Sequence, residues 1–151
     1  MNIITVRQAV FAELEALVPL FDGYRQFYGK SSDFTAERLF LSKRFNHGES
    51  VIFIAERAEK SVGFTQLYPS FSSVSLARVF ILNDLFVHEN TRRSGVASKL
   101  LKAATSYARA VGAVRLSLNT VISNEVAQGL YEAQGWKRDS QFYAYHQAIS
   151  G

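Results

Sequence analysis

Residues 81–97 read ILNDLFVHENTRRSGVA, and this stretch governs how the rest of the chain is interpreted. The preceding residues from Arg78 extend it into a long, nearly continuous apolar run, which is typical of a strand buried on both faces of a sheet. A short polar loop follows, and a helical pattern begins near Ser94. The order strand, loop, helix therefore predicts a helix N-terminus next to the end of a buried strand.

The junction Arg92–Ala97 has the chemistry of an anion site. A helix N-terminus presents backbone N–H groups and partial positive charge, and small residues such as Gly95 and Ala97 let an anion approach that backbone closely. Two arginines precede the glycine. The pattern predicts a site for a phosphate or pyrophosphate. It is neither a Walker loop nor a dinucleotide fingerprint, because the further glycines and the Lys-Ser/Thr pair are missing.

Positive charge is concentrated around this junction. The chain has a net charge of +4, and residues 90–124 contain six basic residues and no acid. Outside that segment the acids outnumber the bases. Such a distribution fits a nucleic-acid surface, a pocket for one small polyanion, or a solvated helix face with salt partners elsewhere.

Length and composition limit the class of protein. A chain of 151 residues with 48% hydrophobic and 20% charged residues is expected to form one globular domain, residues 1–151. There is no cysteine, which excludes disulfides, thiolate metal sites and a cysteine nucleophile. The three histidines have no ligand spacing, so no metal is expected. With no signal-peptide pattern and no apolar run long enough for a membrane helix, a cytoplasmic location is expected.

Hydrophobic periodicity predicts an alternation of strands and helices. Strands are expected over 3–6, 50–55, 61–68, 78–87, 114–119 and 142–148; helices over 11–28, 35–45, 94–111 and 123–134, with a Ser-rich loop over 69–75. Pro19 is expected to kink or divide the first helix, and Leu39, Phe40 and Phe45 are expected to face inward on the second. This order predicts a layered α/β fold with a mostly antiparallel first half and a βαβ second half.

Two segments resemble the GNAT superfamily of acyl-CoA-dependent N-acyltransferases. Arg92–Ala97 matches the pyrophosphate loop Gln/Arg-x-x-Gly-x-Gly/Ala, and residues 124–136, NEVAQGLYEAQGW, resemble Asn-x-x-Ala-x-x-x-Tyr-x-x-x-Gly-Phe with Trp136 in place of Phe. The resemblance implies the GNAT fold: a mixed, mostly antiparallel twisted sheet flanked by about four helices. Residues 68–73 and 83–87 further resemble the histone/polyamine (Hpa-type) branch.

The resemblance implies acetyl-CoA as co-substrate. In the family the fourth strand pairs with the pantetheine arm in a gap where it splays from the next strand, here 114–119. The residues expected to bind acetyl-CoA are Leu85, Phe86, Val87, Arg92, Arg93, Ser94, Gly95, Val96, Ala97, Ser98 and Asn124. Asn124 is also a candidate helix cap.

The resemblance also implies two catalytic residues. Tyr131 aligns with the general acid near the sulfur of CoA, and a phenol with a reference pKa of about 10 can protonate a thiolate whose conjugate thiol has a pKa of about 8.5. The alternative is a tyrosine packed on a helix face. Asp84 is the candidate base, directly or through water, and its alternative is a buried acid paired with an arginine such as Arg78. Without cysteine, transfer is expected to be direct, in a ternary complex.

The acceptor side is expected near Tyr24, Tyr28 and Asp33, with Asp22 and Glu37 as further carboxylates that could attract an amine. The resemblance to the Hpa-type branch implies a small amine, a polyamine or a lysine side chain as acceptor. An amino acid α-amine would instead require a base such as Arg25 or Arg78 for its carboxylate. Two non-enzymatic alternatives are an acyl-CoA-binding module and a small RNA-binding domain. A homodimer formed through the last strands is expected, with no nucleic acid and no membrane as partner.

Overall fold

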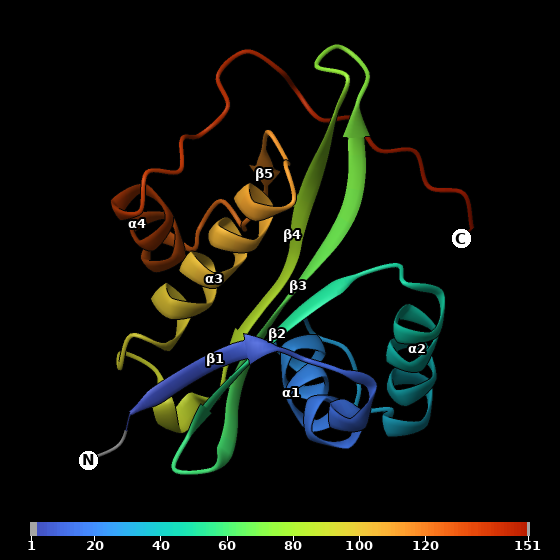
Figure 1. Cartoon of the computed structure of the whole chain (residues 1–151), viewed down its shortest axis with the longest axis vertical. Helices are drawn as coiled ribbons and strands as arrows, with labels where there is room; N and C mark the ends of the chain where they lie inside the picture. The colour runs from blue at the N-terminus through green and yellow to red at the C-terminus, as the bar shows by residue number, and fades with distance from the viewer. Residues whose placement is uncertain (1–2, 151) are drawn as a thin grey trace. The chain divides into compact units, whose positions relative to one another are not determined.

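The structure is a computed structural model that describes residues 3–150. The chain divides into two compact units, Met1–Asn119 and Thr120–Gly151, and each is described on its own. The first unit holds the whole sheet and three of the α-helices, and the second holds one further helix and the C-terminal segment (Figure 1).

The sheet of the first unit has five strands in sequence order, β1-β2-β3-β4-β5. The strands are β1 Ile4–Gln8, β2 Val51–Arg57, β3 Lys60–Ser72, β4 Ala77–Val87 and β5 Leu116–Ser117. The first four pair antiparallel, and β5 joins β4 in parallel after the helical crossover. The predicted α/β class with a mixed, mostly antiparallel sheet is therefore confirmed.

Helices cover both faces of this sheet. On one face lie α1, Leu14–Phe27, and α2, Phe34–His47; on the other lies α3, Val96–Ala110 (Figure 1). Two neighbouring residues of β3 show the division. Phe64 packs against Phe21 of α1, whereas Thr65 pairs with Phe53, whose ring contacts Tyr107 of α3. Successive strand residues point to opposite faces, so each residue of β3 is assigned to one layer.

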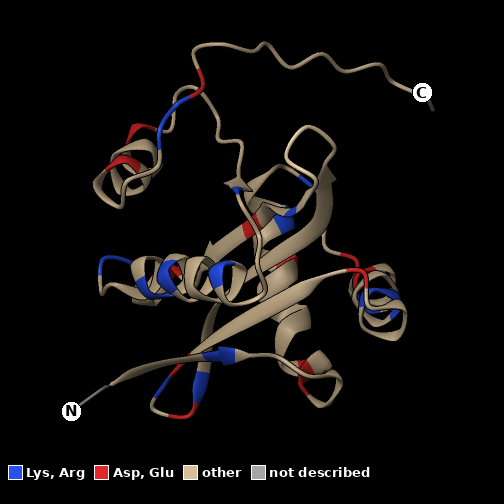
Figure 2. Ribbon diagram, turned by 45° about the horizontal axis from the view of Figure 1, so that its top comes forward, with Lys and Arg blue, Asp and Glu red and all other residues tan. Residues whose placement is uncertain are grey.

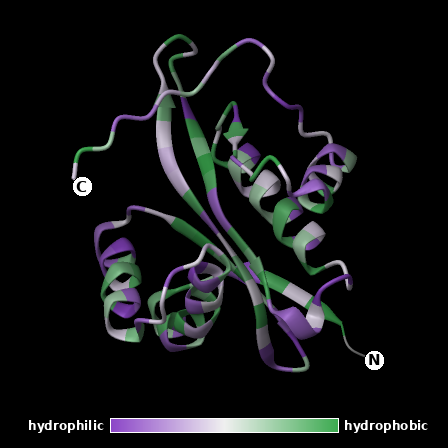
Figure 3. Ribbon diagram, turned by 180° about the vertical axis from the view of Figure 1, so that it is seen from behind, coloured by the Kyte–Doolittle hydropathy of each residue, from purple (hydrophilic) through white to green (hydrophobic). Residues whose placement is uncertain are grey.

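Hydrophobic burial explains why these helices lie where they do. Hydrophobic residues recur along the central strands (Figure 3), and α3 presents one apolar stripe to them. The buried residues of that stripe are Val96, Leu100, Leu101, Ala104 and Ala108. The stripe that periodicity predicts is thus confirmed, and the basic residues of α3 lie off it, along the helix and the loop before it (Figure 2).

Some local predictions need correction. Of the two outcomes expected at Pro19, division of the first helix is wrong, because α1 continues through Pro19 after a short 3-10 turn, Phe11–Glu13. Leu39 is 55% and Phe40 38% exposed, since the buried face of α2 carries Glu37 and Leu41, which are one turn apart. Phe45 does pack against the core, as predicted.

The strand boundaries around Pro69 and β5 also differ from the expectation. Residues 69–72, expected in a loop, continue β3, with Pro69 opposite Phe80. Pairing of β2 with β3 ends at Leu67, so at Pro69 the strand has a neighbour on one side only and tolerates the missing N–H. Of the strand expected over 114–119, only two residues pair with β4.

The second unit contains α4, Glu125–Ala133, and an extended segment after it. The strand expected over 142–148 is wrong: no residue there belongs to a strand, and Phe142, Tyr143 and Tyr145 are at least 77% exposed. A segment rich in strand-forming residues becomes a strand only where a neighbouring strand completes its hydrogen bonds. None of the helices in residues 3–150 is long and apolar enough to cross a membrane.

Candidate active site

The C-terminal half of β4 has an open edge. Pairing between β4 and β5 is confined to Phe80 with Leu116 and Ile81 with Ser117, and no other strand of residues 3–119 reaches that side. Leu85, Phe86 and Val87 pair with β3 on their other side. Pairing with β5 therefore ends before Leu85, and this edge of β4 has no strand partner within residues 3–119, as the predicted gap requires.

The N-terminus of α3 follows this edge directly. Its N-cap is Gly95, with a left-handed φ of 84° and no side-chain cap, and the first intrahelical bond runs from the Lys99 N–H to the Gly95 carbonyl. The N–H groups of Val96 and Ala97 thus precede the helical ladder. A Cβ built on Gly95 would meet nothing within 4 Å, so the backbone is open to an approaching group. Uncapped donors and open space fit the pyrophosphate of a CoA molecule.

The arginines and serine of this loop have distinct roles in the structure. Arg92 donates from Nε to the Val87 carbonyl at 3.0 Å and lies over the Phe86 ring, which ties the loop to the end of β4. Arg93 is exposed and left-handed, with a φ of 67°. The Ser94 hydroxyl donates to the Thr91 carbonyl. Unlike Arg92, Arg93 makes no hydrogen bond, ion pair or ring contact with another residue of 3–150, and it is exposed.

Asp84 lies on β4 just before the open edge and is 1% exposed. Its carboxylate accepts from Gln66 Nε2 at 2.6 Å and from Asn83 Nδ2 at 2.8 Å. Burial raises its pKa, and these two hydrogen bonds offset the rise only in part. The alternative pairing with Arg78 is wrong, because that guanidinium stacks on Phe71, 4.2 Å from the ring centroid. Asp84 is therefore a buried acid held by neutral amides.

Two residues next to Asp84 were not predicted as site residues from the sequence. Gln66 is fully buried within β3, and Tyr68 follows it on the same face of that strand. Burial, and then the negative charge of Asp84, raise the pKa of the Tyr68 phenol above its usual range. A polar glutamine inside the apolar run 62–67 was the signal available in the sequence, since a buried amide needs a polar partner.

The predicted acceptor residues have mixed outcomes. Tyr24 donates its hydroxyl to the Asn83 carbonyl at 3.0 Å, and Tyr28, half exposed, packs edge-on against the Tyr24 ring. Asp33 caps α2 by accepting the Ala36 N–H. Tyr24 of α1 thus contacts β4 at Asn83, next to Asp84, whereas Asp33 caps the N-terminus of α2.

Asp22 and Glu37 are not the surface carboxylates that the sequence suggested, since they are only 5% and 2% exposed. Glu37 is paired with Arg25 at 2.7 Å, which also removes Arg25 as a free partner for a substrate carboxylate. Burial raises the pKa of Glu37. Burial also raises that of Asp22, but hydrogen-bond donors around it, among them Gln26 Nε2 at 2.5 Å, outweigh the burial and lower the pKa. The ion pair of Arg25 with Glu37, beside Asp22, thus links α1 to α2.

A cavity of about 440 Å³ lies between the second half of α1 and the end of β4. Asp22, Gln26 and Phe27 line it from the helix, and Phe86 and Arg92 line it from the strand and the loop. Phe86 and Asp84 are two residues apart on one face of β4, so the cavity begins one step along the strand from the buried carboxylate.

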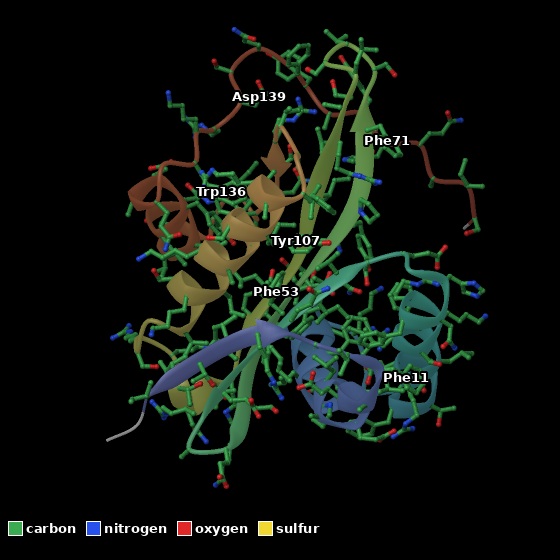
Figure 4. The ribbon with its side chains drawn as sticks, in the orientation of Figure 1. Phe11, Phe53, Phe71, Tyr107, Trp136 and Asp139 are labelled. Atoms are coloured by element: carbon green, nitrogen blue, oxygen red, sulfur yellow. The ribbon has the colours of Figure 1, made fainter. Side chains whose placement is uncertain are left out.

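The remaining predicted residues belong to the second unit. Asn124 is the N-cap of α4, where its side chain accepts the Ala127 N–H at 3.1 Å, so its predicted capping role is confirmed. Tyr131 lies in α4 and is partly buried, with its ring centroid 6.1 Å from that of Trp136. Trp136 follows this helix in the second unit (Figure 4).

The matches to known proteins include residues of both units of the chain. The profile of the Acetyltransferase (GNAT) family matches residues 15–136. The uncharacterized N-acetyltransferase YhfO of Bacillus subtilis is 46% identical over 140 residues, 93% of this chain and 94% of that protein. A probable acetyltransferase of Haemophilus influenzae is 32% identical over 141 residues, 91% of this chain and 92% of its own length.

Solved structures share the fold. The crystal structure of a probable acetyltransferase is 47% identical and superposes with a TM-score of 0.92, covering 97% of this chain and 99% of that one. An aminoglycoside N-acetyltransferase in complex with CoA has a TM-score of 0.81 at 19% identity, with coverage of 99% and 97%. The second likeness concerns the fold alone.

Proposed function

The chain belongs to the GNAT family of acetyltransferases, and from this premise we propose that it transfers the acetyl group of acetyl-CoA directly to a primary amine of a small molecule or a lysine side chain. Family membership decides for an enzyme over the binding-module and RNA-binding alternatives. The Hpa-type branch, a homodimer and a cytoplasmic location stay predictions.

The observation that carries the proposal is Asp84. It is a buried carboxylate with amide partners only, next to a strand edge left open by β5. A buried charge without a counterion is costly, and an incoming ammonium would compensate it. A base with a raised pKa can also take the proton that an amine must lose before attack.

The other residues have complementary roles in this proposal. The family uses acetyl-CoA, which supplies an activated thioester. The open edge of Leu85–Val87 pairs with its extended arm, and the N–H groups of Val96 and Ala97 hold its pyrophosphate together with Arg93. Tyr131 donates a proton to the departing thiolate. The roles of Tyr131 and of the strand edge are those that the resemblance to the family implies, and the chemistry of each group is compatible with its role.

The acceptor class follows from charge. Arg25 is paired with Glu37, and Arg78 precedes Asp84 by six strand residues, roughly 20 Å, so neither is a free base beside Asp84 that could hold the carboxylate of a free amino acid. This supports an acceptor that carries amines and no carboxylate beside them, such as a polyamine or a lysine side chain.

A screen of released CoA thiol tests the proposal. Wild-type protein is incubated with acetyl-CoA and spermidine, a lysine-rich peptide or a mixture of free amino acids. Turnover is expected with the first or the second. Turnover with free amino acids only would refute the acceptor class, and CoA binding without thiol release from any amine would refute the amine acceptor itself.

A further inference from the structure

The strand β4 changes face in its middle. Phe80 and Phe86 are six residues apart, so in a regular strand both would point to the same layer. Phe80 instead contacts Tyr107 of α3, at 5.8 Å between ring centroids, whereas Phe86 lies against Gly23 of α1, where a Cβ would come within 2.7 Å of its ring. One extra residue must therefore lie between them.

That residue is Asn83. Leu67 pairs with Leu82 and Gln66 with Asp84, so Asn83 has no partner in the register of β3 and β4. This is the pattern of a β-bulge, which adds a residue to one strand and redirects the side chains after it. The bulge turns Asp84 to the α1 face of the sheet, where Gln66 holds it.

A side chain of α1 holds the bulge. The Tyr24 hydroxyl donates to the Asn83 carbonyl at 3.0 Å, and the Asn83 side chain donates to Asp84 at 2.8 Å. The Tyr24 ring is itself fixed between aromatic neighbours, 6.3 Å from Phe21 and 6.0 Å from Phe64 between centroids. A chain of contacts thus runs from the core of α1 through the bulge to the carboxylate.

We propose that Tyr24 is a positioning residue for acetyl transfer: its hydroxyl fixes the carbonyl of the β4 bulge and so sets the place of Asp84. The proposal rests on the proposed function, in which the Asp84 carboxylate receives the proton of the amine. It differs from the prediction that Tyr24 binds the acceptor, because its hydroxyl is directed to the backbone of β4.

Tyr24→Phe removes the hydroxyl and keeps the ring. Because small displacements of reacting groups are costly, kcat is expected to fall roughly tenfold, while KM for acetyl-CoA and for the amine stays within about twofold. The matched control is Tyr107→Phe, which removes the same atom from a tyrosine that packs on the other face of β4 (Figure 4). Its kcat is expected to equal that of the wild type.

Hydrogen exchange gives a readout that does not depend on turnover. If the Tyr24 hydroxyl holds the bulge, the amides of residues 83–85 are expected to exchange faster in Tyr24→Phe than in the wild type and in Tyr107→Phe. Unchanged exchange at these amides would overturn the proposal, because the bulge would then keep its geometry without the hydroxyl.

A double variant separates failure of this proposal from failure of the proposed function. If Tyr24 acts through Asp84, adding Tyr24→Phe to Asp84→Asn lowers kcat by much less than tenfold further. Three results would each overturn the positioning role: a full additional tenfold loss in the double variant, an unchanged kcat in Tyr24→Phe, or a raised KM for the amine with a normal kcat. In each case, turnover by the wild type would still support the proposed acetyltransferase activity. Absence of wild-type turnover with every amine would overturn both, whereas faster exchange would then show only that the hydroxyl orders the bulge.

Discussion

Replacing Gly95 by aspartate tests whether the start of α3 holds the pyrophosphate of CoA. Gly95 is the N-cap of that helix, with no side-chain cap and open space around its Cα. Aspartate is a preferred N-cap residue, and it tolerates left-handed backbone better than most residues. The variant is therefore expected to fold, and its carboxylate would accept the same N–H groups that the pyrophosphate needs.

The size of the effect follows from Coulomb's law. Two unit charges about 4 Å apart repel by about 1 kcal/mol in water and about 4 kcal/mol at an effective dielectric constant of 20. Gly95 is exposed, which places the site near the lower value. With competition for the N–H groups added, CoA affinity is expected to fall by at least roughly tenfold.

Gly95→Asn is the matched control. Asparagine has the same shape as aspartate, caps helices equally well and adopts left-handed backbone readily, but it carries no charge. The difference in CoA affinity between the two variants therefore isolates the charge. Because the site is exposed, this difference should shrink when ionic strength rises from about 0.1 M to about 1 M, where the Debye length falls to about 3 Å.

Isothermal titration calorimetry with CoA measures all three proteins, and thermal unfolding confirms that each is folded. Equal affinity of the wild type and Gly95→Asp would refute the reasoning, because a carboxylate cannot share these N–H groups with a pyrophosphate at no cost. Equal loss in the aspartate and asparagine variants would show that shape, and not charge, excludes CoA.

Three further predictions concern catalysis and packing. Asp84→Asn is expected to lower kcat by roughly 10²-fold, because it removes the base. It is also expected to raise the melting temperature at pH 7, because a carboxylate whose pKa is raised on folding destabilises the native state at pH values above that pKa. This gain in melting temperature should disappear as pH falls below the pKa of 3.8 that the carboxylate has in the unfolded chain. A lower melting temperature at pH 7 would contradict this. Tyr131→Phe is expected to lower kcat by roughly 10²-fold with unchanged CoA affinity by calorimetry, and equal kcat would return Tyr131 to a packing role. Gly23→Ala is expected to cost about 1–3 kcal/mol in denaturant unfolding, because its Cβ would lie 2.7 Å from the Phe86 ring.

The approximate helix boundaries and the start of α3 at Gly95 were predictable from the sequence alone. The apolar stripe of α3 recurs at helical spacing, Gly48 ends α2 in the left-handed conformation, and Asn124 caps α4. Each of these features depends on residues within one or two turns of each other. Spacing, capping chemistry and the freedom of glycine at positive φ act over that range, so they can be recognised without knowledge of the fold.

The surroundings of Asp84 were decided only by the tertiary structure. The bulge at Asn83 exists because two strands pair in a particular register, and Tyr24 reaches its carbonyl from 59 positions earlier in the chain. Nothing near residue 84 in the sequence identifies Gln66 as the donor to its carboxylate. For the same reason the aromatic segment 142–148 does not form a strand. The register of paired strands and the neighbours of a buried side chain depend on contacts between residues distant in sequence. Local patterns determine only which secondary structure each segment is able to form.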